Sequence, residues 1–133
     1  MDPSGRAPTI LVADDDPAVI VALQLVFELR GIATDVARSP AEVVQRVAQG
    51  DVRMVVHDMN FSKDDTSGAD GLSLFRRLRR LAPRMPVVLI TSWPAAGMSA
   101  RVLAEGAAAV LAKPWDDEQL VALALRLIRE AQY

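Results

Sequence analysis

Residues 9–17 have the sequence TILVADDDP, in which a short apolar run ends abruptly in three aspartates and a proline. Apolar runs of this length are typical of strands that are buried on both faces of a parallel sheet. The aspartates then stand at the C-terminal tip of the strand, and Pro17 fits the first turn of a following helix. This stretch therefore predicts a buried strand, a polar tip and a helix in succession.

The remainder of the chain repeats this unit of strand and helix. Residues 32–37 predict a second strand, and Ser39-Pro40-Ala41-Glu42 after it has the form of a capping box with proline at the first helical position. Three more apolar segments predict strands at residues 52–58, 86–91 and 107–112. Helices are expected to follow the strands, beginning near Pro17, Ser39, Asp70, Ala95 and Asp116. In the third helix, the spacing predicts that Leu74, Leu78 and Leu81 face the core.

Five buried strands that alternate with helices predict an α/β domain, because each strand returns to the same sheet through a right-handed crossover. We expect a five-stranded parallel sheet with strand order 2-1-3-4-5 and helices on both faces. Residues 9–131 are assigned to this domain and residues 1–8 to a flexible tail. Ligands bind such sheets outside the C-terminal strand ends, where the strand order reverses, so the site is expected between the first and third strands.

Composition limits the classes of protein to which this chain can belong. Its 133 residues, 51% of them hydrophobic, are enough for one buried core and too few for two ordinary domains. The formal charge of −2 gives no support for direct nucleic-acid binding. The chain has no cysteine and one histidine, His57, which excludes a disulfide scaffold, a cysteine-ligated zinc site and a histidine cluster. No apolar run approaches membrane-spanning length, so we expect a cytoplasmic protein without membrane contact.

Three aspartates carry the chemistry that the sequence predicts. Asp14 and Asp15 follow the first strand and Asp58 ends the third, so all three are expected at the same crevice. Clustered carboxylates repel one another unless a cation or a proton neutralises them. Oxygen ligands without histidine or cysteine favour Mg²⁺, with Mn²⁺ as the second choice. Asp16 is instead expected to cap the helix that begins at Pro17.

A lysine and a threonine complete this edge of the sheet. Lys113 follows the fifth strand and Thr91 ends the fourth, which adds a cation and a hydroxyl group to the aspartates. A carboxylate can act as a nucleophile and form an aspartyl phosphate. Phosphoryl transfer depends mainly on positioning and on neutralisation of charge, and these residue types supply both.

With this ordered set of motifs, the sequence resembles the receiver domain of response regulators over roughly residues 9–131. The motifs that carry the resemblance are Ile10-Leu11-Val12-Ala13-Asp14-Asp15-Asp16-Pro17, Asp58, Thr91-Ser92 and Lys113-Pro114. The resemblance implies a flavodoxin-like fold of five βα units and a role in two-component signalling. It implies no enzymatic activity apart from the protein's own phosphorylation and dephosphorylation.

The resemblance also assigns a role to each site residue. Asp58 is the phosphoacceptor, which receives the phosphoryl group from a histidine kinase or a phosphotransfer protein. Asp14 and Asp15 hold Mg²⁺ together with Asp58 and the backbone carbonyl of Asn60. The residues that bind the phosphoryl oxygens are Thr91 and Lys113.

Two features depart from the usual receiver pattern. Val110 stands three residues before Lys113, where the family usually has the tyrosine or phenylalanine of its switch. The stretch between Asp58 and Gly71 is longer than the usual loop. Its first part, Asp58-Met59-Asn60-Phe61, and the segment Lys113-Pro114-Trp115-Asp116 are similar to receivers that often precede AAA+ transcription activators.

Two other functions remain alternatives. The pattern Asp14-x-Asp16 also suits the nucleophile and general acid of a haloacid-dehalogenase-like phosphatase, although the chain is short for that family and lacks a cap domain. A pseudo-receiver, which binds a protein partner without the chemistry, is the second alternative. The complete set of site residues argues against it, whereas Val110 leaves it open.

Several other polar and aromatic residues are interpreted as structural. His57 adjoins Asp58, but strand alternation turns its side chain to the opposite face. The arginines within residues 76–80 are expected on a solvated helix face. The residues expected in a hydrated loop are Asp64, Asp65 and Asp70. The residues expected to be partly buried near the mouth of the site are Trp93 and Trp115.

The expected output is a change in a partner-binding face. Phosphorylation of Asp58 is expected to draw in Thr91 and Lys113 and to repack the face formed by the fourth helix, the fifth strand and the fifth helix. A homodimer through this face is one expected assembly, besides the complex with the kinase. The fourth helix, near residues 95–105, suggests this mechanism because its small side chains leave it loosely anchored.

Overall fold

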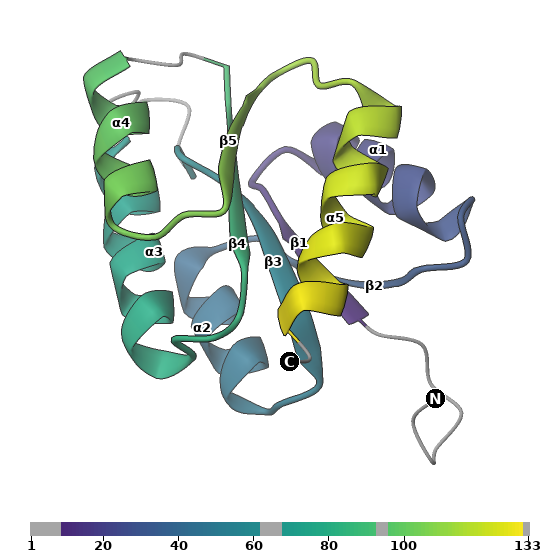
Figure 1. The fold of residues 1–133 in the computed structure, drawn as a ribbon, viewed down its shortest axis with the longest axis horizontal. Coiled ribbons are helices and arrows are strands. Elements are labelled where there is room, and N and C mark those ends of the chain that lie inside the picture. The colour runs from purple at the N-terminus through teal and green to yellow at the C-terminus, as the bar shows by residue number, and fades with distance from the viewer. Residues whose placement is uncertain (1–8, 62–67, 93–95, 132–133) are drawn as a thin grey trace.

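The computed structural model describes residues 9–61, 68–92 and 96–131. Strands and helices alternate within these ranges (Figure 1). The strands are β1 (Thr9–Ala13), β2 (Ala33–Ala37), β3 (Val52–Asp58), β4 (Val87–Thr91) and β5 (Ala109–Ala112). The helices are α1 (Pro17–Glu28), α2 (Pro40–Ala48), α3 (Ala69–Leu81), α4 (Ala96–Ala104) and α5 (Asp117–Ala131). All neighbouring strands are parallel, and the order β2-β1-β3-β4-β5 confirms the predicted flavodoxin-like sheet.

The sheet separates two apolar layers. Figure 1 shows α1 and α5 on one face of the sheet and α2, α3 and α4 on the other. Side chains of β3 alternate between these faces: Met54 and Val56 pack with α1 and α5, whereas Val55 packs with the other three helices. Burial on both faces explains the continuous apolar runs in the sequence, since each fully buried side chain contributes about 1.5–3 kcal/mol to folding.

The predicted starts of α1, α2 and α5 are confirmed, whereas Asp70, which was expected in the loop, is the second residue of α3. Asp16 caps α1, with its carboxylate accepting a hydrogen bond from the Ala18 N–H at 2.9 Å. The hydroxyl oxygen of Ser39 accepts one from the Glu42 N–H at 3.2 Å at the start of α2, and Asp116 caps α5 in the same way. Each cap satisfies an N–H group of the first turn that has no partner within the helix, which stabilises the helix by about 1 kcal/mol.

Strand register brings the polar residues to one edge of the sheet. In the pairing of β1 with β3, Ala13 lies opposite His57, so the next residues on the two strands, Asp14 and Asp58, come together. Thr91, the last residue of β4, pairs with the last residue of β5. Because all of these strands run in the same direction, their C-terminal ends form a single edge, where ligands bind in sheets of this kind.

The structure corrects the prediction for Leu81, which was expected to face the core and is 45% exposed. Helix α3 ends at this residue, and Met85 covers that end of the core instead. Three strands begin later than predicted, at Ala33, Val87 and Ala109. The first residues of a short strand depend on the neighbour that pairs with them, which the local sequence does not encode.

Some predicted features lie outside the described residues, namely the tail at residues 1–8, Asp64, Asp65 and Trp93. Trp115 is half-buried, as predicted, and packs against the layer that contains α1 and α5. In the described ranges, no helix combines the length and the apolar character needed to cross a membrane.

Candidate functional site

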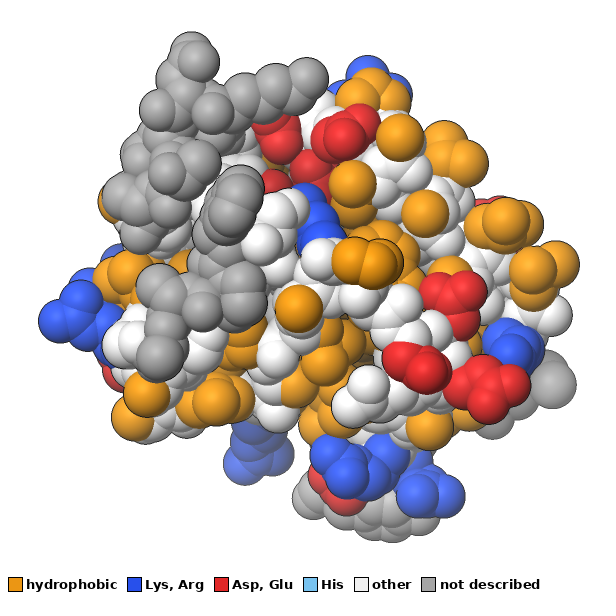
Figure 2. Space-filling view, turned by 90° about the horizontal axis from the view of Figure 1, so that it is seen from above, with side chains coloured by type: hydrophobic (Ala, Val, Ile, Leu, Met, Phe, Trp, Pro, Cys, Tyr) orange, Lys and Arg blue, Asp and Glu red, His pale blue; other side chains and the backbone are white. Residues whose placement is uncertain are grey.

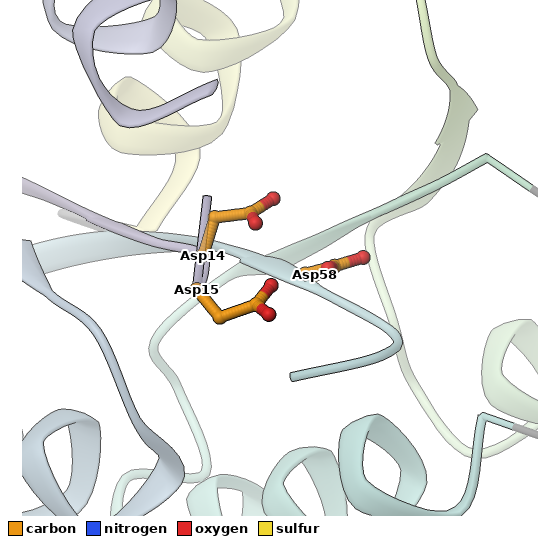
Figure 3. Close-up of side chains that lie close together, drawn as sticks. All are labelled: Asp14, Asp15 and Asp58. Atoms are coloured by element: carbon orange, nitrogen blue, oxygen red, sulfur yellow. The ribbon is translucent and has the colours of Figure 1, made fainter. Parts of the chain in front are cut away.

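Three carboxylates meet at the C-terminal edge of the sheet. Ligand oxygen atoms of Asp14, Asp15 and Asp58 lie within 4.8 Å of one another. Figure 3 shows the three carboxylates pointing to the same side, two of them from the tip of β1 and one from the end of β3. Asp14 is fully buried and Asp58 is 5% exposed, whereas Asp15 is half-buried. The predicted cluster is therefore present, with two of its members largely shielded from water.

Local hydrogen bonds orient Asp14. Its Oδ1 accepts a hydrogen bond from the Asp16 N–H at 2.9 Å, and its own N–H donates to the Ala37 carbonyl at 3.3 Å. Asp14 is thus bound both to the turn that follows it and to the end of β2. The carboxylate of Asp16 accepts from the Ala18 N–H and is engaged as a helix cap, which separates its role from that of the other two aspartates.

Lys113 brings a positive charge to this cluster. Its Nζ lies 2.8 Å from Asp14 Oδ2 and 3.5 Å from Asp58 Oδ2. Its backbone N–H donates to the Thr91 carbonyl at 2.9 Å, which ties the end of β5 to the end of β4. Figure 2, which views this edge of the sheet, shows acidic side chains gathered beside a basic one. One ammonium group cannot neutralise three carboxylates, so negative charge is left over in the crevice.

Burial and mutual repulsion alter the titration of the cluster. Burial, and after it the charge of Asp14, raises the pKa of Asp58 to about 6. Burial also raises the pKa of Asp14, against the opposing hydrogen bond from Lys113. For Lys113, burial acts to lower the pKa, but the hydrogen bond to Asp14 and the charge of Asp58 outweigh it and raise the pKa. A divalent cation would relieve this excess of negative charge, and the oxygen-only donor set fits Mg²⁺.

Thr91 and Asn60 lie close to the end of β3, the strand that carries Asp58. Thr91 is 3% exposed and ends β4, the neighbour of β3. Asn60 lies two residues beyond Asp58, and its backbone forms a hydrogen bond with that carboxylate that acts to lower the pKa of Asp58. The Asn60 side chain accepts a hydrogen bond from the Gly68 N–H at 2.7 Å. Sequence reasoning missed this contact, although asparagine near the start of a loop often accepts from a nearby backbone N–H.

The sequence as a whole matches one protein family. The family profile described as "Response regulator receiver domain" matches residues 10–125, a range that contains every predicted site residue. The chain belongs to the response regulator receiver domains. The resemblance inferred from its motifs is thereby confirmed.

Individual relatives agree with this assignment. The receiver is 30% identical over 120 residues to the C4-dicarboxylate transport transcriptional regulatory protein DctD of Rhizobium meliloti (strain 1021), an alignment that covers 90% of the receiver and 25% of DctD. It is 26% identical over 123 residues to the DNA-binding transcriptional regulator NtrC of Escherichia coli (strain K12), covering 92% of the receiver and 25% of NtrC. The receiver thus spans about a quarter of the length of these two curated relatives. Both relatives are transcriptional regulators, in line with the similarity to receivers that precede transcription activators.

A solved structure shows the same fold. The response regulator receiver domain protein (CheY-like) from Methanospirillum hungatei JF-1 has a TM-score of 0.85 with this receiver at 20% sequence identity. The alignment covers 96% of the receiver and 98% of that chain. At this level of identity the comparison supports the fold, and the chemistry depends on the residues described above.

His57 lies next to Asp58 in this receiver but outside the acidic cluster. Its ring is fully buried, Nδ1 lies 2.8 Å from the Asp58 carbonyl oxygen, and the ring centroid is 6.1 Å from that of Phe61. Nε2 has no hydrogen-bond partner among the residues that the structure describes. Burial lowers the pKa of His57 to about 4, so the ring is neutral at pH 7. The prediction that His57 stays apart from the aspartates is confirmed within the described ranges.

Val110 takes the position of the family's switch aromatic. It lies in β5 opposite Leu89 of β4, is half-buried and packs against the layer formed by α2, α3 and α4. A valine has no ring that could move between a buried and an exposed rotamer. A ring movement at this position is therefore excluded.

Proposed function

We propose that this receiver accepts a phosphoryl group on Asp58 in a reaction that requires Mg²⁺. The observation that carries the proposal is the cluster of Asp14, Asp15 and Asp58, whose oxygens lie within 4.8 Å of one another beside Lys113. The donor is a histidine kinase or a phosphotransfer protein, the usual partners of the receiver family. Residues 9–131 form the receiver unit, which acts in the cytoplasm.

The metal site uses oxygen atoms alone. Asp14, Asp15 and Asp58 hold Mg²⁺, with the backbone carbonyl of Asn60 as a further ligand, and Mn²⁺ serves as a substitute. When bound, Mg²⁺ would supply the positive charge that offsets these carboxylates and the incoming phosphoryl group. The hydrogen bond from Asp16 to Asp14 supports this role, because it keeps one carboxylate oriented before the ion binds.

Asp58 is the nucleophile of the reaction. One of its carboxylate oxygens forms a bond to phosphorus as the bond between phosphorus and the donor's histidine nitrogen breaks, and that nitrogen keeps the electron pair. Lys113, whose Nζ is 3.5 Å from the Asp58 carboxylate, binds the phosphoryl oxygens together with Thr91. These groups supply positioning and charge, which are the main needs of phosphoryl transfer. The receiver catalyses its own phosphorylation and dephosphorylation and no other reaction.

Two observations weigh against the phosphatase alternative. A haloacid-dehalogenase-like phosphatase would need Asp16 as its general acid, whereas this carboxylate is bound to the Ala18 N–H as a helix cap. The match of residues 10–125 to the receiver family also favours the switch. The pseudo-receiver alternative is less well supported, because the residues needed for the chemistry are all present.

The output surface is the face formed by α4, β5 and α5, which binds the next partner or a second copy of the receiver. Helix α4 is held there by few side chains, since Val102 is fully buried whereas Leu103 is 46% exposed. Just beyond its C-terminal end, Glu105 accepts hydrogen bonds of 2.7 and 2.9 Å from Arg76 of α3. This end of α4 is therefore anchored, and the larger rearrangement is expected at the end that begins near the site.

Nearly complete switching requires phosphorylation to favour the active state by on the order of 5 kcal/mol.

The test is intact mass spectrometry after incubation with acetyl phosphate and Mg²⁺. A single phosphoryl adduct is expected on the wild type and on Asp16→Asn, which keeps the helix cap. No adduct is expected on Asp58→Ala or on the wild type with EDTA. A folded wild type that takes no phosphoryl group in the presence of Mg²⁺ would instead support the pseudo-receiver, and labelling of Asp58→Ala would remove Asp58 as the acceptor.

A further inference from the structure

Among the described residues, a hydrogen bond joins the two ends of the segment between β3 and α3. The Gly68 N–H donates to the side-chain oxygen of Asn60 at 2.7 Å, across eight positions of the chain. The bond joins the second residue after β3 to the last residue before α3. We name the hydrogen bond between Asn60 Oδ1 and the Gly68 N–H the Asn60 clasp.

The backbone next to the clasp is held on both sides. The Met59 N–H donates to the Ile90 carbonyl, and the Met59 carbonyl accepts from the Gly71 N–H, both at 2.9 Å. A Cβ atom at Gly71 would come within 2.4 Å of the Met59 backbone, so α3 packs directly on this peptide. Met59 is therefore held by its backbone, whereas the placement of the next residue, Asn60, depends on its side chain.

Gly68 can form the clasp because of its conformation and its surroundings. Its φ of +82° lies in the left-handed region, which glycine adopts without steric cost. A Cβ atom here would lie 3.4 Å from Met59 Cε and 3.6 Å from Met98 Cε, so the residue is covered by one methionine after β3 and one from α4. A backbone N–H in such a buried position needs an acceptor, and Asn60 supplies it.

Asn60 also contacts the acceptor through its main chain. Its backbone forms a hydrogen bond with the Asp58 carboxylate, and its carbonyl is the further Mg²⁺ ligand of the proposed function. We propose that Asn60 is a positioning residue: the Asn60 clasp holds these two peptide groups in place for Asp58 and for Mg²⁺. The part of the inference that concerns the metal rests on the proposed function.

An open loop would leave these peptide groups free to move. The entropy lost when the ends of a loop are held together grows with its length. The clasp joins Asn60 to Gly68 and thereby holds the Asn60 peptide groups beside the site. Loss of the clasp removes one hydrogen bond. We expect Mg²⁺ binding to become roughly two- to ten-fold weaker as a result.

The experiment compares three variants of the whole chain with the wild type. Asn60→Ala removes the clasp, whereas Asn60→Asp keeps an oxygen that can accept from the Gly68 N–H. Phe61→Ala is the matched control, since Phe61 is the next residue and packs against the core without taking part in the clasp. For each protein, calorimetry gives the dissociation constant of MgCl₂ without a phosphodonor, and amide hydrogen exchange reports on the Gly68 N–H.

The expected result separates the clasp from general stability. Asn60→Ala weakens Mg²⁺ binding and speeds exchange at Gly68. Asn60→Asp retains slow exchange at Gly68 and binds Mg²⁺ no more weakly than the wild type, since it keeps the acceptor oxygen and adds negative charge beside the site. Phe61→Ala matches the wild type in both properties. Wild-type Mg²⁺ affinity in Asn60→Ala, or unchanged exchange at Gly68, would overturn the inference. Clasp-dependent Mg²⁺ binding by a receiver that takes no phosphoryl group from acetyl phosphate would support this inference and reject the proposed function.

Discussion

Lys113 and Asp14 are 99 positions apart in the chain, and their side chains form an ion pair with an N–O distance of 2.8 Å. The pair joins the end of β5 to the tip of β1 across two intervening strands. The Asp14 side chain is 1% exposed and that of Lys113 is 16% exposed, so water screens their attraction only weakly. In the absence of metal, this pair is the main compensation for the charge of the acidic cluster.

Replacing Lys113 by methionine should therefore destabilise the metal-free receiver. The change leaves the buried carboxylates of Asp14 and Asp58 without their cation, so we expect the free energy of unfolding to fall by on the order of 2 kcal/mol. Urea denaturation at pH 7 with EDTA measures the effect. Lys113→Arg, which keeps the charge, should lose much less, and equal stability of Lys113→Met and the wild type would show that the pair contributes nothing.

Neutralising Asp58 should stabilise the metal-free receiver. The pKa of Asp58 is raised from 3.8 to about 6, so at pH 7 the folded state pays for an ionised group that the unfolded chain accommodates freely. Asp58→Asn is expected to be more stable at pH 7 by on the order of 1–2 kcal/mol.

The pH dependence of this difference has a definite sign. As pH falls from about 6 to about 4, the folded wild type binds a proton at Asp58 before the unfolded chain does, so the wild type gains stability relative to Asp58→Asn. The advantage of the variant should shrink across this window. Urea denaturation at several pH values in EDTA checks it, and an advantage that grows toward acid pH would contradict the raised pKa.

Magnesium should stabilise the receiver through Asp15. Each tenfold rise in Mg²⁺ above its dissociation constant is expected to add about 1.4 kcal/mol to the free energy of unfolding of the wild type. Asp15→Asn removes the charge of one ligand and should raise the dissociation constant, so that a higher Mg²⁺ concentration is needed for the same stabilisation. Asp16→Asn is the neighbouring control, because asparagine caps a helix as well as aspartate does, and it should respond to Mg²⁺ as the wild type does. Equal responses of the two variants would exclude Asp15 as a ligand.

Replacing His57 by leucine should stabilise the receiver at acid pH. The pKa of His57 is lowered from 6.5 to about 4, so below pH 6.5 the unfolded chain binds a proton that the folded protein excludes. The wild type therefore loses stability as pH falls through this window. Between pH 7 and pH 5, its free energy of unfolding should fall by on the order of 2 kcal/mol more than that of His57→Leu.

Urea denaturation of the two proteins at pH 7 and pH 5 measures this loss. Titration of Asp58 occurs in both proteins and largely cancels from the comparison. An equal loss in the wild type and in His57→Leu would mean that the ring can be protonated in the folded state.

Much of the fold was predictable because its signals are local. The stretch TILVADDDP contains a buried strand, its polar tip and a capped helix start, and similar units recur along the chain. Once five such units were counted, the handedness of crossovers left few topologies. The roles of Asp16 as a cap and of His57 as a residue apart from the cluster were also predictable, because they follow from helix-start chemistry and strand alternation.

Other features could not be predicted because they depend on distant segments. Leu81 has the spacing of a core residue, yet it is exposed because the helix ends there and Met85 covers the core instead. The ion pair of Arg76 with Glu105 joins residues 29 positions apart on a face that was predicted to be merely solvated. Helical periodicity describes the direction of a side chain within its own helix and contains no information about its partner in another segment.

The sequence by itself determined the order of the elements and the kinds of group at the strand tips, because apolar periodicity, caps and residue types are properties of short segments. Only the tertiary structure decided the distances, including the carboxylate that Lys113 takes as its nearer partner and the bond between Asn60 and Gly68. Those contacts depend on the register of parallel strands and on the packing of loops against them, which arise only when distant parts of the chain come together.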